Sequence, residues 1–105
     1  MIEADSHGPA LLQARAAAAA RLLRALANEH RLLILCHLVE GEMSVGQLQA
    51  VVGLSQSALS QHLAVLREDG LVATRRESQT IWYRIDDPAA LRVVETLADI
   101  FCPPN

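Results

Sequence analysis

Residues 55–70 read SQSALSQHLAVLREDG, and the rest of the chain can be interpreted outward from this stretch. Leu59, Leu63 and Leu66 recur at helical spacing, which predicts an amphipathic helix with one core face. The opposite face consists of the small and polar residues Gln56, Ser57, Ser60, Gln61 and Ala64. Hydroxyl and amide groups hydrogen-bond phosphates and base edges when a helix lies in a DNA major groove. The alternative is an ordinary solvated helix face, so the flanking sequence has to distinguish the two.

Two shorter helices are predicted before this stretch. Asn28 is the expected N-cap of the first, and Gly41 ends it. Ser44 and Gln47 form a capping-box pattern that starts the second, which ends at Gly53. The apolar residues expected to be buried are Leu32, Leu35, Cys36 and Val39 on the first helix and Val45, Leu48, Val51 and Val52 on the second. A short helix, a glycine-containing turn and the polar-faced helix together predict a helix-turn-helix.

After Gly70 the pattern changes to an alternation that is typical of β-strands. Residues 71–76 and 80–85 predict two strands, joined by a turn at residues 77–79. A hairpin directly after a helix-turn-helix is a wing. We expect its arginines, Arg75, Arg76 and Arg84, to contact DNA phosphates or the minor groove.

A first helix over residues 10–26 and a last helix that begins at Pro88 complete the expected domain, which spans residues 10–102 between tails at 1–9 and 103–105. Their apolar stripes are Leu11, Leu12, Leu22, Leu23 and Leu26, and Leu91, Val94, Leu97, Ala98 and Phe101. Alanines at 16–20 would let a second helix approach closely, as at a subunit interface, although an ordinary alanine-rich surface helix is the alternative. The predicted fold class is mainly α with a β-hairpin: a winged helix-turn-helix of order α-α-α-α-β-β-α.

Composition narrows the class of partner. The net charge is −3, which argues against indiscriminate binding to nucleic acid. Residues 55–85 nevertheless carry four arginines against three acids, whereas residues 86–105 carry one arginine against four acids. A dimer of such chains can present a basic face while it remains acidic overall. A monomer of 105 residues is also marginal in stability, so dimerisation is expected.

Other function classes have no support in the sequence. There is no glycine-rich phosphate loop, no pair of catalytic carboxylates and no Ser/His/Asp motif, so neither an enzyme nor a cofactor is expected. No secretory signal or membrane span is recognised, and we expect a cytoplasmic protein. Its two cysteines are then expected to be thiols at rest.

Three blocks together resemble the ArsR/SmtB family of winged-helix transcriptional repressors: LANEHRLLIL at 26–35, LSQSALSQHLAVLREDGLV at 54–72 and IWYRI at 81–85. The resemblance covers residues 20–101. It implies a homodimer, joined through its first and last helices, that binds double-stranded operator DNA with an inverted repeat until an inducer releases it. It places the recognition contacts at Gln56, Ser57, Ser60, Gln61 and His62. A packed or capping role is the alternative for His62.

The resemblance also bears on the inducer. Metal-sensing members carry thiols in the third helix or Asp/His pairs on the last helix. Here the third helix, SVGQLQAVV at 44–52, has no Cys, His or acid, and the last helix has no His. A metal site needs three or four convergent ligands, so no metal is expected.

The positions of Cys36 and Cys102 resemble those in the sulfide- and persulfide-responsive subgroup represented by BigR, SqrR and HlyU. In that subgroup the two thiols of one subunit are oxidised together, to a disulfide or to a bridge with extra sulfur atoms. The resemblance implies that Cys36 and Cys102 are redox-sensing and that the inducer is a persulfide or polysulfide. We expect Cys36, which His30 and His37 flank, to attack first and Cys102 to resolve, and the reverse order stays open.

Other interpretations of the cysteines stay open. Cys36 can be a small core residue, and Cys102 a terminal thiol without a role. As(III), another oxidant or a metal at an unrecognised site is the alternative trigger.

Overall fold

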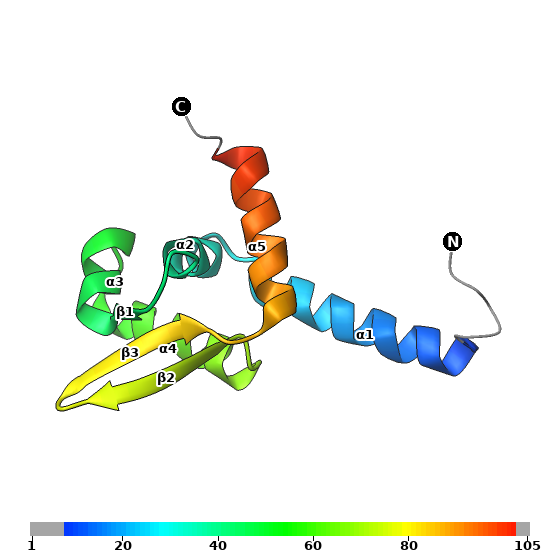
Figure 1. Cartoon of the computed structure of the whole chain (residues 1–105), viewed down its shortest axis with the longest axis horizontal. Helices are drawn as coiled ribbons and strands as arrows, with labels where there is room; N and C mark the ends of the chain where they lie inside the picture. Colours follow the sequence, from blue (N-terminus) through cyan, green and yellow to red (C-terminus); the bar gives the residue numbers. More distant parts are fainter. Residues whose placement is uncertain (1–7, 103–105) are drawn as a thin grey trace.

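The computed structural model describes residues 8–102 as five helices and a small antiparallel sheet (Figure 1). The elements are α1 (Pro9–Leu26), α2 (Glu29–Leu38), β1 (Met43–Ser44), α3 (Val45–Val52), α4 (Gln56–Glu68), β2 (Val72–Glu77), β3 (Thr80–Ile85) and α5 (Pro88–Phe101). The predicted winged helix-turn-helix is confirmed, with β1 as an addition. Residues 1–7 and 103–105 of the predicted tails lie outside the described range.

The helix starts are formed by the side chains that the sequence indicates. The Asn28 side chain accepts a hydrogen bond from the backbone N–H three residues later, at 3.0 Å. Ser44 and Gln47 form the complete capping box, in which each side chain accepts from the backbone N–H of the other. Ser55 caps α4 more simply, because its hydroxyl accepts a hydrogen bond from the backbone N–H of Ala58 at 3.2 Å. Each cap satisfies an N–H group that the first helical turn leaves without a partner, so α2, α3 and α4 begin where predicted.

The turn between α3 and α4 depends on Gly53. This residue ends α3 in the left-handed conformation, with a φ of 71°, which residues other than glycine rarely adopt. Only Leu54 and the cap Ser55 then separate the two helices. The short connection holds α4 at a fixed angle to α3, as a helix-turn-helix requires.

The hydrophobic core forms between α2, α4, the sheet and the N-terminal half of α5. On α4 the predicted face is confirmed, because Leu59, Leu63 and Leu66 are at most 2% exposed. On α2 the predicted face is partly wrong: Ile34 and Leu38 are buried beside Leu35, whereas Leu32, Cys36 and Val39 are only partly buried. Helix α2 contacts α1, α3, α4, α5 and β3. When a helix is apolar and packed on most of its sides, the spacing of its apolar residues does not identify one buried face.

Helix α3 gives a second correction. Leu48 and Val52 are buried as predicted and Val45 is partly buried, but the side chain of Val51 is exposed. Residues 51 and 52 are neighbours in an eight-residue helix and point about 100° apart. Both cannot face the same narrow core, and the packing selects Val52.

The predicted hairpin is part of a three-stranded sheet of order β1-β3-β2. In it Met43 pairs with Tyr83, and Val72 pairs with Ile85. Strand β1 was not predicted, since two residues are too short to show an alternating pattern. Tyr83 and Ile85 pack against the core, so Trp82 and Arg84, which alternate with them along β3, point to the outer face of the sheet.

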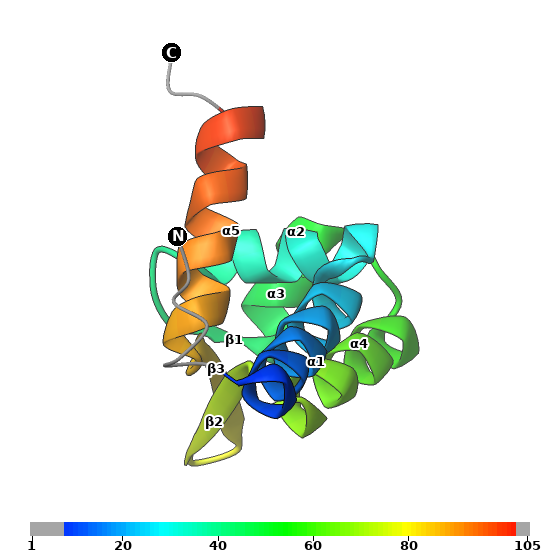
Figure 2. The same cartoon turned by 90° about the vertical axis from the view of Figure 1, so that its right-hand side faces the viewer.

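Helix α1 and the C-terminal half of α5 extend away from this core (Figures 1 and 2). The buried residues of α1 are confined to its last turn, at Ala25 and Leu26. The radius of gyration is 15.9 Å, against about 13 Å for a compact chain of this length. Within residues 8–102, no helix has both the length and the apolar character that crossing a membrane requires.

Candidate functional site

The polar face of α4 is open to solvent. Gln56, Ser57, Ser60 and Gln61 are all exposed. Within the described residues, the side chains of Gln56, Ser60 and Gln61 make no hydrogen bond, and Ser57 has only a 3.4 Å contact with the hydroxyl of Ser55. A helix with unpaired amides and hydroxyls in a row has the donors and acceptors that read base edges in a major groove.

His62, the remaining residue that was assigned to base contacts, has a different environment. It is partly buried, and its ring centroid lies 5.6 Å from that of His30 on α2. Burial lowers the pKa of His62, and the positive charges of Arg31 and His30 lower that pKa further. His62 therefore packs between α4 and α2, which fits the packing role that the sequence left open.

This environment predicts a pH dependence of stability. Because the folded protein holds the pKa of His62 below its ordinary value of 6.5, it binds fewer protons there than the unfolded chain does. The free energy of unfolding should therefore fall as the pH is lowered through 6.5, and this loss should stop below the folded pKa. Urea denaturation at a series of pH values measures this. His62→Gln should flatten that part of the profile, and equal flattening by the control His37→Gln would contradict the assignment.

The three wing arginines differ in their freedom. The Arg75 guanidinium is bound by Glu42 at 2.8 Å and by Glu77 at 3.3 Å. Arg84 has only a long contact of 3.7 Å with Asp86, and Arg76 donates from Nε to the backbone carbonyl oxygen of Ser78 at 3.2 Å. Exposed single contacts of this kind are weak. Arg76 and Arg84 can therefore turn to a phosphate, whereas Arg75 is already held.

A groove of about 450 Å³ lies between the C-terminal half of α4 and strand β3, and it contains a residue that the sequence interpretation missed. The groove is lined by Val45, Ser60, Leu63, Ala64, Arg67, Glu68 and Tyr83. The exposed side chain of Arg67 makes no hydrogen bond or ion pair with any described residue. Its signal in the sequence was its spacing, because Arg67 follows Ala64 by three residues and extends the polar face by one turn.

The two cysteines come from elements that pack together. Cys36 is partly buried on α2, Cys102 is exposed as the C-cap of α5, and neither forms a disulfide. Helices α2 and α5 are in contact. Burial raises the pKa of the Cys36 thiol, and the charge of Cys102 raises it further.

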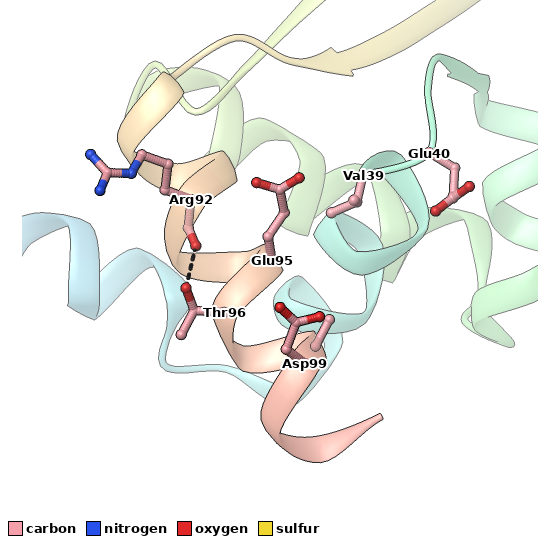
Figure 3. Close-up of a pocket in the computed structure, with 7 residues that line it drawn as sticks. Val39, Glu40, Arg92, Glu95, Thr96 and Asp99 are labelled. Atoms are coloured by element: carbon pink, nitrogen blue, oxygen red, sulfur yellow. Dashed lines mark hydrogen bonds between the residues drawn. The ribbon is translucent and has the colours of Figure 1, made fainter. Parts of the chain in front are cut away.

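An open cavity of about 570 Å³ lies between the end of α2 and α5, and its lining includes residues that are close to Cys36 and Cys102 in the sequence (Figure 3). It is lined by Val39, Glu40, Arg92, Glu95, Thr96, Ala98 and Asp99. Val39 lies one turn after Cys36, and Asp99 one turn before Cys102. Figure 3 shows Glu95 of α5 and Val39, the C-cap of α2, among the residues that line this cavity. Small solutes can therefore reach the contact between the two helices. Among residues 8–102, no group of three or more His, Cys, Asp or Glu side chains is placed to hold a metal ion.

Comparisons with known proteins agree with this geometry. Residues 28–74 match the family described as "Bacterial regulatory protein, arsR family". The transcriptional activator HlyU of Vibrio cholerae is 49% identical over 94 residues, which cover 90% of this chain and 87% of that protein. The biofilm growth-associated repressor of Agrobacterium fabrum is 47% identical over 94 residues, which cover 90% of this chain and 80% of that protein.

A solved structure extends the likeness to three dimensions. The structure of reduced HlyU from Vibrio cholerae has a TM-score of 0.84 and 49% identity, and the match covers 87% of this chain and 96% of that chain. The match therefore extends well beyond residues 28–74. The chain therefore belongs to the ArsR family of bacterial transcriptional regulators, which are DNA-binding proteins and not enzymes.

Proposed function

We propose that this chain is a homodimeric, cytoplasmic repressor that releases its operator when a persulfide or polysulfide joins Cys36 to Cys102. The single observation that carries the proposal is that the two free thiols lie on α2 and at the C-cap of α5, and that these two helices are in contact. A bridge between them would attach the end of the last helix to the second helix. The relative from Agrobacterium fabrum is named a repressor and HlyU an activator. We favour repression because the resemblance in the sequence implies it.

The side chains that we propose as operator contacts are exposed and have few or weak contacts within the described residues. Gln56, Ser57, Ser60 and Gln61 contact base edges from α4, while Arg76 and Arg84 contact phosphates or the minor groove from the wing. Two recognition helices of a dimer then reach half-sites of an inverted repeat one helical turn apart.

Arg67 is proposed as a further phosphate contact, at the groove between α4 and β3. Arg67→Ala should weaken binding to operator and to unrelated DNA by a similar factor, because a phosphate contact carries no sequence information. It should also reduce the slope of log K against log salt by about one. Fluorescence anisotropy titrations at several salt concentrations measure both effects. Gln61→Ala is the matched control, for which we expect relaxed sequence preference and an unchanged slope. A selective loss of operator binding in Arg67→Ala would contradict the assignment.

The proposed subunit interface is formed by α1 and α5. Leu11, Leu12 and Leu23 on α1 are exposed, as are Ile100 and Phe101 on α5. The buried residues of α1 are confined to its last turn, so the exposed leucines on the rest of the helix need a partner surface. The same helices on a second copy supply one.

The proposed sulfur chemistry begins at Cys102. The sequence suggested that Cys36 attacks first, but its raised pKa disfavours the thiolate, whereas Cys102 is exposed. The Cys102 thiolate attacks the outer sulfur of a persulfide RSSH, which forms Cys102–S–SH and releases RS⁻. The Cys36 thiolate then attacks the inner sulfur, which forms the Cys36–Cys102 disulfide and releases HS⁻. If Cys36 is first converted to its own persulfide, the same attack leaves one extra sulfur atom in the bridge.

The experiment combines mass and binding on the same sample. Reduced protein is treated with a defined organic persulfide, and intact mass and operator affinity are then measured. We expect loss of operator binding together with a mass change of minus two hydrogens, or that change plus one sulfur for each inserted atom. A bridged mass with unchanged operator binding would refute the switch. Release by As(III) but not by persulfide would assign the thiol pair to the alternative inducer.

A further inference from the structure

Arg75 contacts three other side chains on the outer face of the sheet. We call Glu42, Arg75, Glu77 and Trp82 together the wing clamp. Arg75 donates from Nε to both carboxylate oxygens of Glu42 at 2.9 Å, and its Nη2 lies 2.8 Å from one of them. Its Nη1 donates to Glu77 at 3.3 Å. The guanidinium carbon lies 5.4 Å from the centre of the Trp82 ring. Arg75 thus combines a two-pronged ion pair with a stacked ring.

The wing clamp joins the wing to the helix-turn-helix. Glu42 belongs to the connection that leads from α2 into β1 and α3, and it is 33 residues away from Arg75 in the chain. Arg75 on β2 lies opposite Trp82 on β3, which in turn pairs with Ser44 of β1. Strand β1 contributes only two paired residues. The Glu42–Arg75 contact therefore adds a charged link between the wing and the segment that leads into α3, beside the apolar contacts of β3 with α2 and α3.

The charges argue against Arg75 as a phosphate contact. Two carboxylates, from Glu42 and Glu77, surround one guanidinium, so the group as a whole carries a net negative charge. The hydrogen bonds that Arg75 donates to Glu42 are the main cause that raises the pKa of Arg75 above its ordinary value. A phosphate that approached this guanidinium would have to displace Glu42 and would be repelled by both carboxylates.

Trp82 contributes its ring face to the wing clamp, where the Arg75 guanidinium lies over it. Its indole Nε1 is buried and has no acceptor among the described residues. Trp82 is also the one tryptophan of the chain, which makes its fluorescence a specific report on the wing clamp.

We propose that Arg75 is a positioning residue, which holds the wing in its DNA-binding orientation through Glu42 and Trp82 and makes no contact with DNA itself. This reassigns a residue that the sequence predicted as a DNA contact. The proposal rests on the DNA binding of the family and is independent of the thiol switch.

Glu42→Gln separates the two roles by the sign of its effect. If Arg75 contacts a phosphate, removal of a competing carboxylate frees the guanidinium and operator affinity rises. If Arg75 positions the wing, the neutral amide loosens the clamp, and affinity falls on the order of fivefold. Glu77→Gln is the matched control, with the same change of charge at a single longer contact, and we expect a smaller loss.

Arg75→Lys and Arg75→Ala give the second comparison. Lysine keeps the charge but loses the planar, two-pronged geometry, so it should bind operator as weakly as alanine does. Both variants should shift Trp82 emission in the free protein while circular dichroism and Tm confirm folding. Neither should change the salt slope, in contrast to Arg76→Ala, which should lower it by about one. Tighter binding by Glu42→Gln, rescue by lysine, or a reduced salt slope in Arg75→Ala would each overturn the proposal.

Discussion

Leu23→Glu combined with Phe101→Glu is expected to convert the proposed dimer to a monomer and to lower operator affinity by at least about 100-fold. The Leu23 side chain is 58% exposed on α1, and that of Phe101 is 75% exposed on α5. Burial of a leucine or phenylalanine side chain contributes roughly 1.5–3 kcal/mol, and a symmetric interface buries each residue twice. A carboxylate in the same place loses this contribution and has to be desolvated. A monomer then holds only one half-site.

Sedimentation equilibrium and operator titrations measure the two effects separately. Leu33→Glu makes the same change at a similarly apolar, exposed position on α2, and it should leave the dimer intact. Circular dichroism of each single variant checks that the fold is retained. If the double variant sediments as a dimer, α1 and α5 do not form the subunit interface.

Cys102→Ser is expected to abolish the release of operator DNA by persulfide, where the wild type loses affinity by at least about 100-fold. Serine removes the exposed thiol that attacks first, so neither the persulfide at Cys102 nor the bridge can form. Cys36→Ser should also keep its operator, but it should accumulate one extra sulfur at Cys102 because no partner thiol remains to displace it. Mass spectrometry of the two variants therefore distinguishes first attack from resolution. Full release in either variant would refute a switch that needs both thiols.

The order of attack also has a pH signature. The pKa of Cys36 is raised above its ordinary value of 9.0, by burial first and by Cys102 second. At neutral pH the raised pKa makes its thiolate scarcer than that of an ordinary cysteine. Alkylation of Cys36 in Cys102→Ser should accordingly accelerate about tenfold per pH unit between pH 7 and 8.5. Cys102→Ser also removes the second cause of the raised pKa of Cys36. If the Cys36 thiolate is still scarce in this variant, burial is the cause.

The predicted dimer interface and the predicted thiol switch both involve the C-terminal end of α5. Phe101, the most exposed of the large apolar side chains described, is adjacent to Cys102. A bridge from Cys102 to Cys36 would pull this end of α5 toward α2 and would move a residue of the proposed subunit interface. A small shift there changes the separation of the two recognition helices, and half-sites one DNA turn apart tolerate little change in that separation.

Much of the architecture is predictable from short-range patterns. Ser44 and Gln47 cap α3 through contacts three residues apart, and the Leu59, Leu63 and Leu66 face of α4 repeats at helical spacing. Such features depend only on neighbours along the chain, which any sequence displays directly. Local pattern failed where a helix is apolar on most sides, as at Ile34 and Leu38 on α2, and where a strand is only two residues long, as in β1.

Partnerships between distant residues were settled by tertiary packing alone. Arg75 was visible in the sequence as a basic wing residue, but its carboxylate partner Glu42 lies 33 residues earlier in the chain. His62 resembled a base-reading residue until its ring was found beside that of His30. Residue spacing along a helix or strand determines which side chains share a face, but it carries no information about what another element places opposite that face. For charged and titratable groups the opposite side decides the role, because a partner within a few ångströms changes both their charge state and their freedom to bind.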